Sequence, residues 1–280
     1  MSRLPDFLII GAMRSGSTAL FKYLAEHPSI FMAYPKEVRY FNKHFDMGIE
    51  WYRDHFDEAN SDQLAGEATP SYMHHHETVD RMADTVPGAR LIAILRDPVD
   101  RTYSHYWMDR TSGRADVSFE TYLEDTRVLE WGRYAEKLRM VTGRFPKNQL
   151  HVVFHEQLRD RPRDLYQEVC GFLGVDTTVF PPSLGRTINP YLEFRSFAFR
   201  SWYQRLPPSL GMAKSLAGRL NTRRRTYPPM RKDTREWLAG YFSPLNDDLA
   251  MWLGREPPGW TTAQHGAPRR RPASDPPEVQ

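Results

Sequence analysis

Phe7-Leu8-Ile9-Ile10-Gly11-Ala12-Met13-Arg14-Ser15-Gly16-Ser17-Thr18-Ala19-Leu20 is the stretch of sequence that decides the fold. The apolar run over 7–10 predicts a buried strand, and Ser17 and Thr18 open a helix with one apolar stripe. Between them Gly11 and Gly16 let the backbone turn tightly and approach a ligand closely. A strand, a glycine loop and a helix N-terminus form an anion site, because free N–H groups and the helix dipole point into the loop. We therefore interpret this stretch as a phosphate-binding loop; an ordinary strand-to-helix turn is the alternative.

The loop differs from the nucleoside-triphosphate loop in its cation. The spacing of its two glycines matches that loop, but Ser17 stands where a lysine is expected. The next clear strand, predicted over 91–95, runs into Arg96, whereas triphosphate chemistry needs a magnesium-binding acid on a neighbouring strand. The cationic side chain within the loop is Arg14. This pattern favours a phosphorylated ligand neutralised by arginines rather than by a metal, although Asp97 follows at once.

Composition narrows the class of protein. The chain has 280 residues, enough for one large domain or two small ones, and its 38 basic and 35 acidic residues nearly balance. A net charge of +3 does not suggest a nucleic-acid partner. The single Cys170 permits no intrachain disulfide and favours a reducing compartment. Because no apolar run approaches membrane-spanning length, we predict a cytoplasmic protein without a membrane span.

Strand and helix patterns alternate along the chain. Beyond the first strand, further strands are predicted over 30–32, 64–68, 91–95 and 150–154. Helices are predicted from Ser17 and over 48–56, 77–86, 98–109, 132–143, 162–173 and 232–253. This alternation predicts an α/β fold with a central parallel β-sheet flanked by helices, and ligands at the carboxyl ends of the strands. We expect a single domain over 1–255 and a disordered Pro- and Arg-rich tail over 256–280.

A second motif follows the strand predicted over 91–95, and it reads Arg96-Asp97-Pro98-x-x-Arg101-x-x-Ser104. Arg96 caps the strand, and Ser104 lies about two helical turns later, so both side chains could grip one anion. Arginine offers a planar fork suited to phosphate oxygens, and serine offers a hydroxyl donor. An ion pair between Arg96 and Asp97 or Asp100 is the alternative interpretation.

With the two phosphate motifs in this order and spacing, the chain resembles the sulfotransferases that use 3′-phosphoadenosine 5′-phosphosulfate (PAPS). More narrowly, Lys36-Glu37-Val38-Arg39-Tyr40-Phe41 resembles the segment of the heparan sulfate O- and N-sulfotransferases that carries a catalytic glutamate. Weaker similarities are Phe145-Pro146, His155-Glu156-Gln157-Leu158 and Phe172-Leu173-Gly174. The resemblance covers roughly residues 6–260 and implies a P-loop-like architecture and metal-free chemistry.

The resemblance implies which residues bind the donor. Arg14 stands where many family members have lysine, and it would stabilise the charge that develops on the departing phosphate. Arg96 and Ser104 would bind the 3′-phosphate. The 5′-phosphosulfate would lie in the first loop, on Arg14, Ser15, Gly16, Ser17 and Thr18. A late basic loop would close over the nucleotide through Arg223, Arg224, Arg225, Thr226 and Tyr227, although the family's glycine there is Arg224. A solvated basic loop is the alternative for that run.

The resemblance also implies a reaction centre around Glu37. This carboxylate would be the general base that takes the proton from an acceptor hydroxyl as sulfur is attacked in line. An ion pair of Glu37 with Lys36 or Arg39 on the surface is the alternative. The family's lysine before a Thr-Pro or Ser-Ala pair is Ala68 here, so a cation is missing. Either Arg39 or one of His74, His75 and His76 replaces it, or the chemistry relies on Arg14 alone.

The resemblance thus implies an enzyme that moves the sulfonyl group of PAPS to a hydroxyl, with an amine as the less favoured alternative, and releases adenosine 3′,5′-bisphosphate. The acceptor would be a carbohydrate or a glycosylated small metabolite, contacted by Arg39, Tyr72 and His74. Two other functions stay open: a magnesium-dependent small-molecule kinase that uses ATP, and a non-catalytic nucleotide- or glycan-binding protein. The sequence names neither the acceptor nor the oligomeric state.

Overall fold

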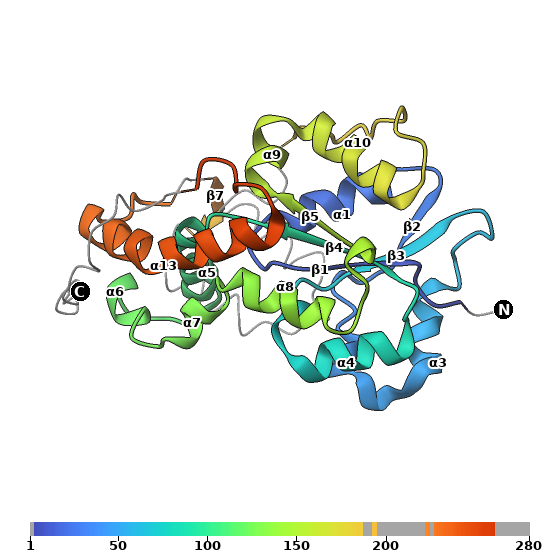
Figure 1. Cartoon of the computed structure of the whole chain (residues 1–280), viewed down its shortest axis with the longest axis horizontal. Coiled ribbons are helices and arrows are strands. Elements are labelled where there is room, and N and C mark those ends of the chain that lie inside the picture. Colours follow the sequence, from blue (N-terminus) through green and yellow to red (C-terminus); the bar gives the residue numbers. More distant parts are fainter. Residues whose placement is uncertain (1–2, 187–191, 195–221, 225–226, 261–280) are drawn as a thin grey trace.

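A central parallel β-sheet organises the computed structural model, which describes residues 3–186, 192–194, 222–224 and 227–260. Its strand order is β2-β3-β1-β4-β5 (Figure 1). The strands are β1 (Phe7–Gly11), β2 (Ile30–Met32), β3 (Leu64–Ala68), β4 (Arg90–Leu95) and β5 (Leu150–Phe154). Neighbouring strands pair in parallel throughout this sheet. The predicted α/β fold with a central parallel sheet is therefore confirmed.

Strand β1 lies at the centre because its side chains are apolar on both faces. Leu8 and Ile10 point into one hydrophobic cluster, and Phe7 and Ile9 point into a second. All five residues of β1 are buried, which is typical of a parallel strand covered by helices on both sides. The continuous apolar run of the sequence follows from this position.

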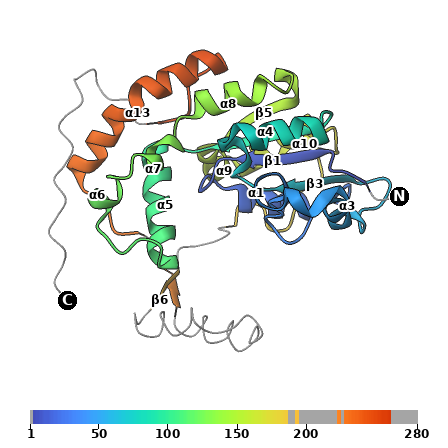
Figure 2. The ribbon, with the colours of Figure 1, turned by 90° about the horizontal axis from the view of Figure 1, so that it is seen from below.

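Helices cover both faces of the sheet and the end where the strands finish. Helices α1 (Ser17–Ala25), α9 (His155–Asp160) and α10 (Pro162–Leu173) lie on one face, and α3 (Gly48–Arg53), α4 (His76–Thr85) and α8 (Tyr134–Thr142) on the other (Figure 1). A third group lies beyond the carboxyl ends of the strands (Figure 2). It comprises α5 (Pro98–Ser112), α6 (Phe119–Tyr122), α7 (Arg127–Glu130) and α13 (Lys232–Leu253). These elements share a hydrophobic cluster of their own, so they can carry residues over the edge where ligands bind.

Short elements complete the described chain. They are α2 (Tyr40–Lys43), the 3₁₀ turns η1 (Phe45–Met47), η2 (Asp54–Phe56), η3 (Tyr72–His74) and η4 (Lys147–Gln149), and the antiparallel pair β6 (Leu192–Phe194) and β7 (Thr222–Arg224). Helices α6, α7 and α9 were not predicted, because segments of four to six residues are too short to show helical periodicity. Helix α5 also continues to Ser112, beyond its predicted end at 109, and stops where Gly113 adopts φ 78°.

The packed part of the chain extends further than predicted. Trp260 lies within the stretch expected to be a disordered tail, yet it is 6% exposed. Its ring packs on Tyr134 and Phe154, with ring centroids 5.7 and 5.5 Å away. The expected boundary at 255 was therefore wrong over 256–260, because one large aromatic side chain finds a place in the core. Residues 261–280 lie outside the described residues, and the single-domain organisation over 1–255 stays a prediction. Within the described part of the chain, no helix is long and apolar enough to span a membrane.

Candidate active site

The loop between β1 and α1 is built closely against α9. Gly16 precedes α1 with φ 103°, in the left-handed region that favours glycine. A Cβ atom at Gly16 would lie 2.7 Å from Leu158 Cδ2 and 3.0 Å from His155 Nδ1. Arg14 also has a positive φ, 66°, so this loop holds its backbone in a shape that an ordinary turn rarely has. Gly16 is therefore required both by conformation and by space.

His155 supports the same loop from the first turn of α9. Its Nδ1 atom lies 3.1 Å from the carbonyl oxygen of Ser15. Because a carbonyl only accepts, Nδ1 must carry the hydrogen. Burial, and then the nearby positive charge of Arg96, lower the pKa of His155 to about 4, so the ring is neutral at neutral pH. The one signal of His155 in the sequence is the family similarity of the 155–158 segment, which does not indicate a role for this side chain.

Arg14, Ser104 and Tyr227 meet although they come from three separate segments. The Arg14 guanidinium donates from Nε to Ser104 Oγ at 3.1 Å and from NH2 to Tyr227 Oη at 3.1 Å. The Tyr227 ring is parallel to that of Trp107, with an interplanar angle of 11° and centroids 5.8 Å apart. The residues predicted to bind the nucleotide from the first loop, from α5 and from the late basic segment thus meet here. The Arg14 side chain lies with the residues expected at the 3′-phosphate.

Arg96 joins this group through the main chain of the loop. Its NH1 atom donates to the carbonyl oxygen of Arg14 at 3.2 Å, and Tyr134 Oη donates to the carbonyl oxygen of Arg96 at 2.8 Å. The acids that were alternative partners of Arg96 make other contacts. Asp97 caps α5 by accepting from backbone N–H groups, and Asp100 pairs with Arg235 at 2.7 Å. The observed contacts therefore place Arg96 at the loop between β1 and α1.

Glu37 lies between two cations of its own segment. Arg39 donates to Glu37 Oε2 from Nε at 2.9 Å, and its NH2 lies 2.8 Å from the same oxygen. Lys36 Nζ is 3.9 Å from Glu37 Oε1, and burial lowers the pKa of Lys36 despite the opposing charge of Glu37. The Glu37 side chain is 18% exposed. The ion pairs of the alternative interpretation are thus present, but they hold a carboxylate that still has access to solvent.

Two cationic side chains lie beside Glu37, whereas the residue at the position of the family's lysine is Ala68. Ala68 is buried at the end of β3, whereas Arg39 and Lys36 both reach the Glu37 carboxylate. His74 is 7% exposed and packs on Trp131, with ring centroids 4.1 Å apart. Of Arg39, His74, His75 and His76, the residues expected to replace the lysine, Arg39 is the one with a contact to Glu37, and Lys36 joins it there.

The structure does not support acceptor contacts by Tyr72 and His74. Tyr72 is fully buried and donates to Glu67 Oε1 at 2.8 Å. Neither ring nitrogen of His74 has a hydrogen-bond partner within the described residues, and burial lowers its pKa well below the usual range. Both side chains were expected at the cleft because they follow β3 at its carboxyl end. Both instead turn into the core under α4 and α8, a direction that the sequence pattern does not reveal.

The other residues predicted to bind the nucleotide lie only partly within the described part of the chain. Arg223 and Arg224 lie in β7, opposite Glu193 and Leu192 of β6. Arg225 and Thr226 lie outside the described residues. Within the first loop Ser15 is fully buried and Ser17 nearly so, while Gly16 and Thr18 are partly exposed at the N-terminus of α1.

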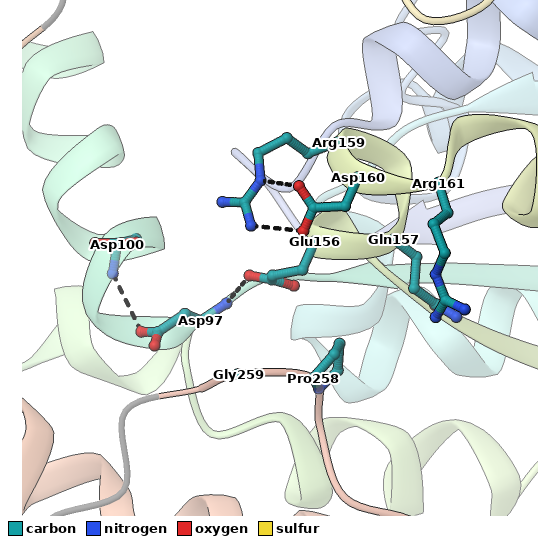
Figure 3. A pocket seen from close by; sticks show the side chains of 9 residues that line it. All are labelled: Asp97, Asp100, Glu156, Gln157, Arg159, Asp160, Arg161, Pro258 and Gly259. Atoms are coloured by element: carbon teal, nitrogen blue, oxygen red, sulfur yellow. Dashed lines mark hydrogen bonds and ion pairs between the residues drawn. The ribbon is translucent and has the colours of Figure 1, made fainter.

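A cavity of about 300 Å³ lies at the carboxyl ends of β4 and β5 (Figure 3). Its lining residues are Asp97, Asp100, Glu156, Gln157, Arg159, Asp160, Arg161, Pro258 and Gly259. Glu156 Oε1 accepts from the Asp97 N–H at 3.1 Å, and Arg159 is paired with Asp160 at 2.7 and 2.8 Å. Carboxylates outnumber arginines in this lining, so it does not suit a phosphate group.

Comparisons with known proteins agree with this geometry. The family model described as "Sulfotransferase domain" matches residues 4–201. The chain is 34% identical to bifunctional heparan sulfate N-deacetylase/N-sulfotransferase 4 of Mus musculus, over 92% of this chain and 31% of that protein. It is 42% identical to the membrane-associated sulfotransferase kil1 of Dictyostelium discoideum, over 45% of this chain and 29% of that protein. The chain thus spans about a third of the length of these relatives.

A solved structure shows the same fold. The sulfotransferase from Alicyclobacillus acidocaldarius superposes with a TM-score of 0.70, at 24% identity, and the match covers 92% of this chain and 99% of that one. Since the identity is below a quarter, this likeness concerns the fold alone.

Proposed function

The chain belongs to the sulfotransferase family, and from this premise we propose that it transfers the sulfonyl group of PAPS to an acceptor hydroxyl. The observation that carries the proposal is the convergence of Arg14, Arg96 and Ser104 at the loop before α1. Two arginines and a hydroxyl at a helix N-terminus suit a nucleotide with more than one phosphate group.

The described residues fit such a donor. The N-terminus of α1 and the backbone N–H groups of the loop would hold the 5′-phosphosulfate, since a helix N-terminus favours negative charge. Arg96 and Ser104 would bind the 3′-phosphate, and Tyr227 would join them from the late segment. Arg14 belongs to the loop that would hold the 5′-phosphosulfate, and its side chain reaches Ser104. Its guanidinium would therefore lie near both the 5′- and the 3′-phosphate groups. When bound, PAPS supplies the activated sulfonyl group.

Glu37 is the proposed general base. It would take the proton of the acceptor hydroxyl while that oxygen forms its bond to sulfur and the bond between sulfur and the 5′-phosphate oxygen breaks. Arg14 would stabilise the charge that appears on that phosphate oxygen, so that adenosine 3′,5′-bisphosphate leaves as the product. Arg39 and Lys36 would hold the Glu37 carboxylate in place through their ion pairs.

The proposed acceptor is a carbohydrate or a glycosylated small metabolite. This rests on the similarity to an enzyme named for heparan sulfate and on the resemblance of the 36–41 segment. Arg39 is the proposed acceptor contact, because its side chain is 47% exposed beside Glu37.

Titration calorimetry tests the donor assignment. Adenosine 3′,5′-bisphosphate and ATP would each be titrated with and without magnesium. We expect the bisphosphate to bind more tightly than ATP and without any need for the metal. Equal affinity, or binding that strictly needs magnesium, would favour a kinase instead. Nucleotide binding without transfer from labelled PAPS to any sugar in an acceptor screen would favour a non-catalytic protein.

A further inference from the structure

Glu67 is a fully buried carboxylate at the end of β3, away from the contacts that the proposed reaction uses. It accepts three hydrogen bonds of 2.8 Å. Tyr52 and Tyr72 donate to Oε1, and Thr69 donates to Oε2. An ionised carboxylate buried in a core rarely stabilises a protein more than apolar side chains of the same volume would. Its presence therefore points to a purpose other than stability.

Two of the three donors connect Glu67 to the segment that carries Glu37. The Thr69 hydroxyl, which donates to Glu67, accepts from the N–H of Arg39 at 3.2 Å. The Tyr72 hydroxyl accepts in the same way from the N–H of Phe41, at 3.5 Å. A hydroxyl has one hydrogen, and a carboxylate only accepts. Because Glu67 takes the hydrogen of the Thr69 hydroxyl and that of the Tyr72 hydroxyl, each of these two oxygens presents a lone pair to a backbone N–H.

The segment needs such support because its backbone is strained next to Glu37. Arg39 has φ 60°, in the left-handed region that a non-glycine residue seldom adopts. From this position its side chain turns back to Glu37 Oε2. A residue in such a conformation persists only where its surroundings hold it. The Arg39 N–H is held by Thr69, and the Arg39 carbonyl accepts from the N–H groups of Lys43 and His44 at 2.9 and 3.2 Å.

We infer that Glu67 is a positioning residue for Glu37, acting through Thr69 on the backbone of Arg39 and through Tyr72 on that of Phe41. This inference rests on the proposed role of Glu37 as general base. Burial raises the pKa of Glu67 to about 7 although its three donors lower it, so the carboxylate form that accepts all three bonds predominates above about pH 7.

The test compares three variants of the full chain. Thr69→Val removes the hydroxyl that links Glu67 to Arg39, and Thr69→Ser keeps it. Tyr52→Phe removes a hydrogen bond of the same length to Glu67, from a hydroxyl that, within the described residues, does not bond to the 36–41 backbone. The readouts are kcat and acceptor KM with labelled PAPS and completely desulfated heparin, the Kd of adenosine 3′,5′-bisphosphate, and hydrogen exchange of the Arg39 amide.

For Thr69→Val we expect kcat to fall about tenfold to a hundredfold, since a small displacement of a catalytic group has effects of this size. Nucleotide Kd should stay within about threefold, because Thr69 is not among the residues proposed to bind the nucleotide. The Arg39 amide should exchange at least about tenfold faster once its acceptor is gone. Thr69→Ser should restore kcat and the exchange rate of the Arg39 amide to the wild-type values. Tyr52→Phe should lower kcat by no more than about threefold.

Three results would overturn the inference. The first is a Thr69→Val variant whose Arg39 amide is as protected as in the wild type, which needs no acceptor to measure. The second is a Thr69→Ser variant that is as slow as Thr69→Val, and the third is a Tyr52→Phe variant that is equally slow. If Glu37→Gln itself keeps full turnover, the proposed general base fails, and this inference fails with it.

Discussion

The guanidinium of Arg14 donates a hydrogen bond of 3.1 Å to the hydroxyl of Ser104, although 90 positions separate the two residues in the chain. Arg14 belongs to the loop after β1, and Ser104 lies on α5, after β4. Because β1 and β4 are neighbours in the sheet, the segments that follow them meet at one edge. This contact unites two phosphate motifs that the sequence shows separately.

Glu37→Gln is expected to reduce turnover by about a hundredfold or more, because a positioned general base contributes ~10² to 10⁴. Nucleotide affinity should stay the same, since Glu37 is not among the proposed donor residues. Steady-state rates with labelled PAPS and calorimetry with adenosine 3′,5′-bisphosphate measure the two effects. Glu50→Gln is a matched control, because Glu50 pairs with Arg53 at 2.6 Å but lies on the outer helix α3. An unchanged kcat in Glu37→Gln would exclude Glu37 as the base.

Arg96→Ala is expected to weaken binding of adenosine 3′,5′-bisphosphate by about 1.5–3 kcal/mol per charged hydrogen bond lost. This corresponds to roughly tenfold to a hundredfold in Kd. Binding of adenosine 5′-monophosphate, which has no 3′-phosphate, should change much less, and calorimetry with both nucleotides makes the comparison. Arg159→Ala supplies the control, because Arg159 lines the neighbouring acidic cavity and is paired with Asp160. The 3′-phosphate assignment is wrong if both nucleotides lose the same affinity.

Arg14→Gln and Ser104→Ala should affect different steps. Without the Arg14 charge, kcat should fall by about 10² to 10³, the usual effect of removing one group that stabilises transition-state charge. Ser104→Ala removes only a hydroxyl, so it should raise the nucleotide Kd and leave kcat at saturating PAPS near the wild-type value. Full kinetics in PAPS for both variants distinguish the two roles. If Arg14→Gln changes Kd alone, Arg14 binds the nucleotide but does not stabilise the leaving phosphate.

Stability should decrease as the pH falls from about 6.5 to about 4, in part because of His155. Its folded pKa of about 4 lies below the ordinary value of 6.5, so the unfolded chain binds a proton that the folded chain does not. Stability is thus complete above the unfolded pKa and is lost as pH falls through this window. One pKa unit corresponds to about 1.4 kcal/mol, so His155 should contribute a loss of up to ~3 kcal/mol at pH 4.

Urea unfolding between pH 7 and pH 4 measures this contribution. His155→Asn is the matched variant, because the Asn side-chain amide can still donate to the Ser15 carbonyl but does not titrate. We expect its stability to depend less steeply on pH than that of the wild type. His105, whose pKa burial also lowers to about 4, and His74, whose pKa burial lowers well below its usual value, contribute to the remaining slope. Parallel curves for the two proteins would show that His155 is not the group concerned.

Local patterns in the sequence were enough for much of the fold. The run over 7–10 and the two glycines after it placed β1 and the loop, and the stretch 232–253 was predicted with the bounds that α13 has. Such features depend on side chains near one another in sequence, so apolar periodicity and glycine positions reveal them. Trp260 could not be placed this way, because its burial depends on Tyr134 and Phe154, which are far away in the chain.

For the candidate site too, the sequence and the tertiary structure each determined a different part. The sequence alone determined which residue types could hold phosphates, because Arg14, Arg96 and Ser104 occur in short motifs, and the resemblance of the 36–41 segment indicated Glu37 as a base. Only the tertiary structure decided where their side chains go. It joined Arg14 to Ser104, and it turned Tyr72 into the core as a support for Glu67. The physical reason is that a side chain's direction depends on the elements packed against it, and strand order and helix packing bring those elements together from distant parts of the chain.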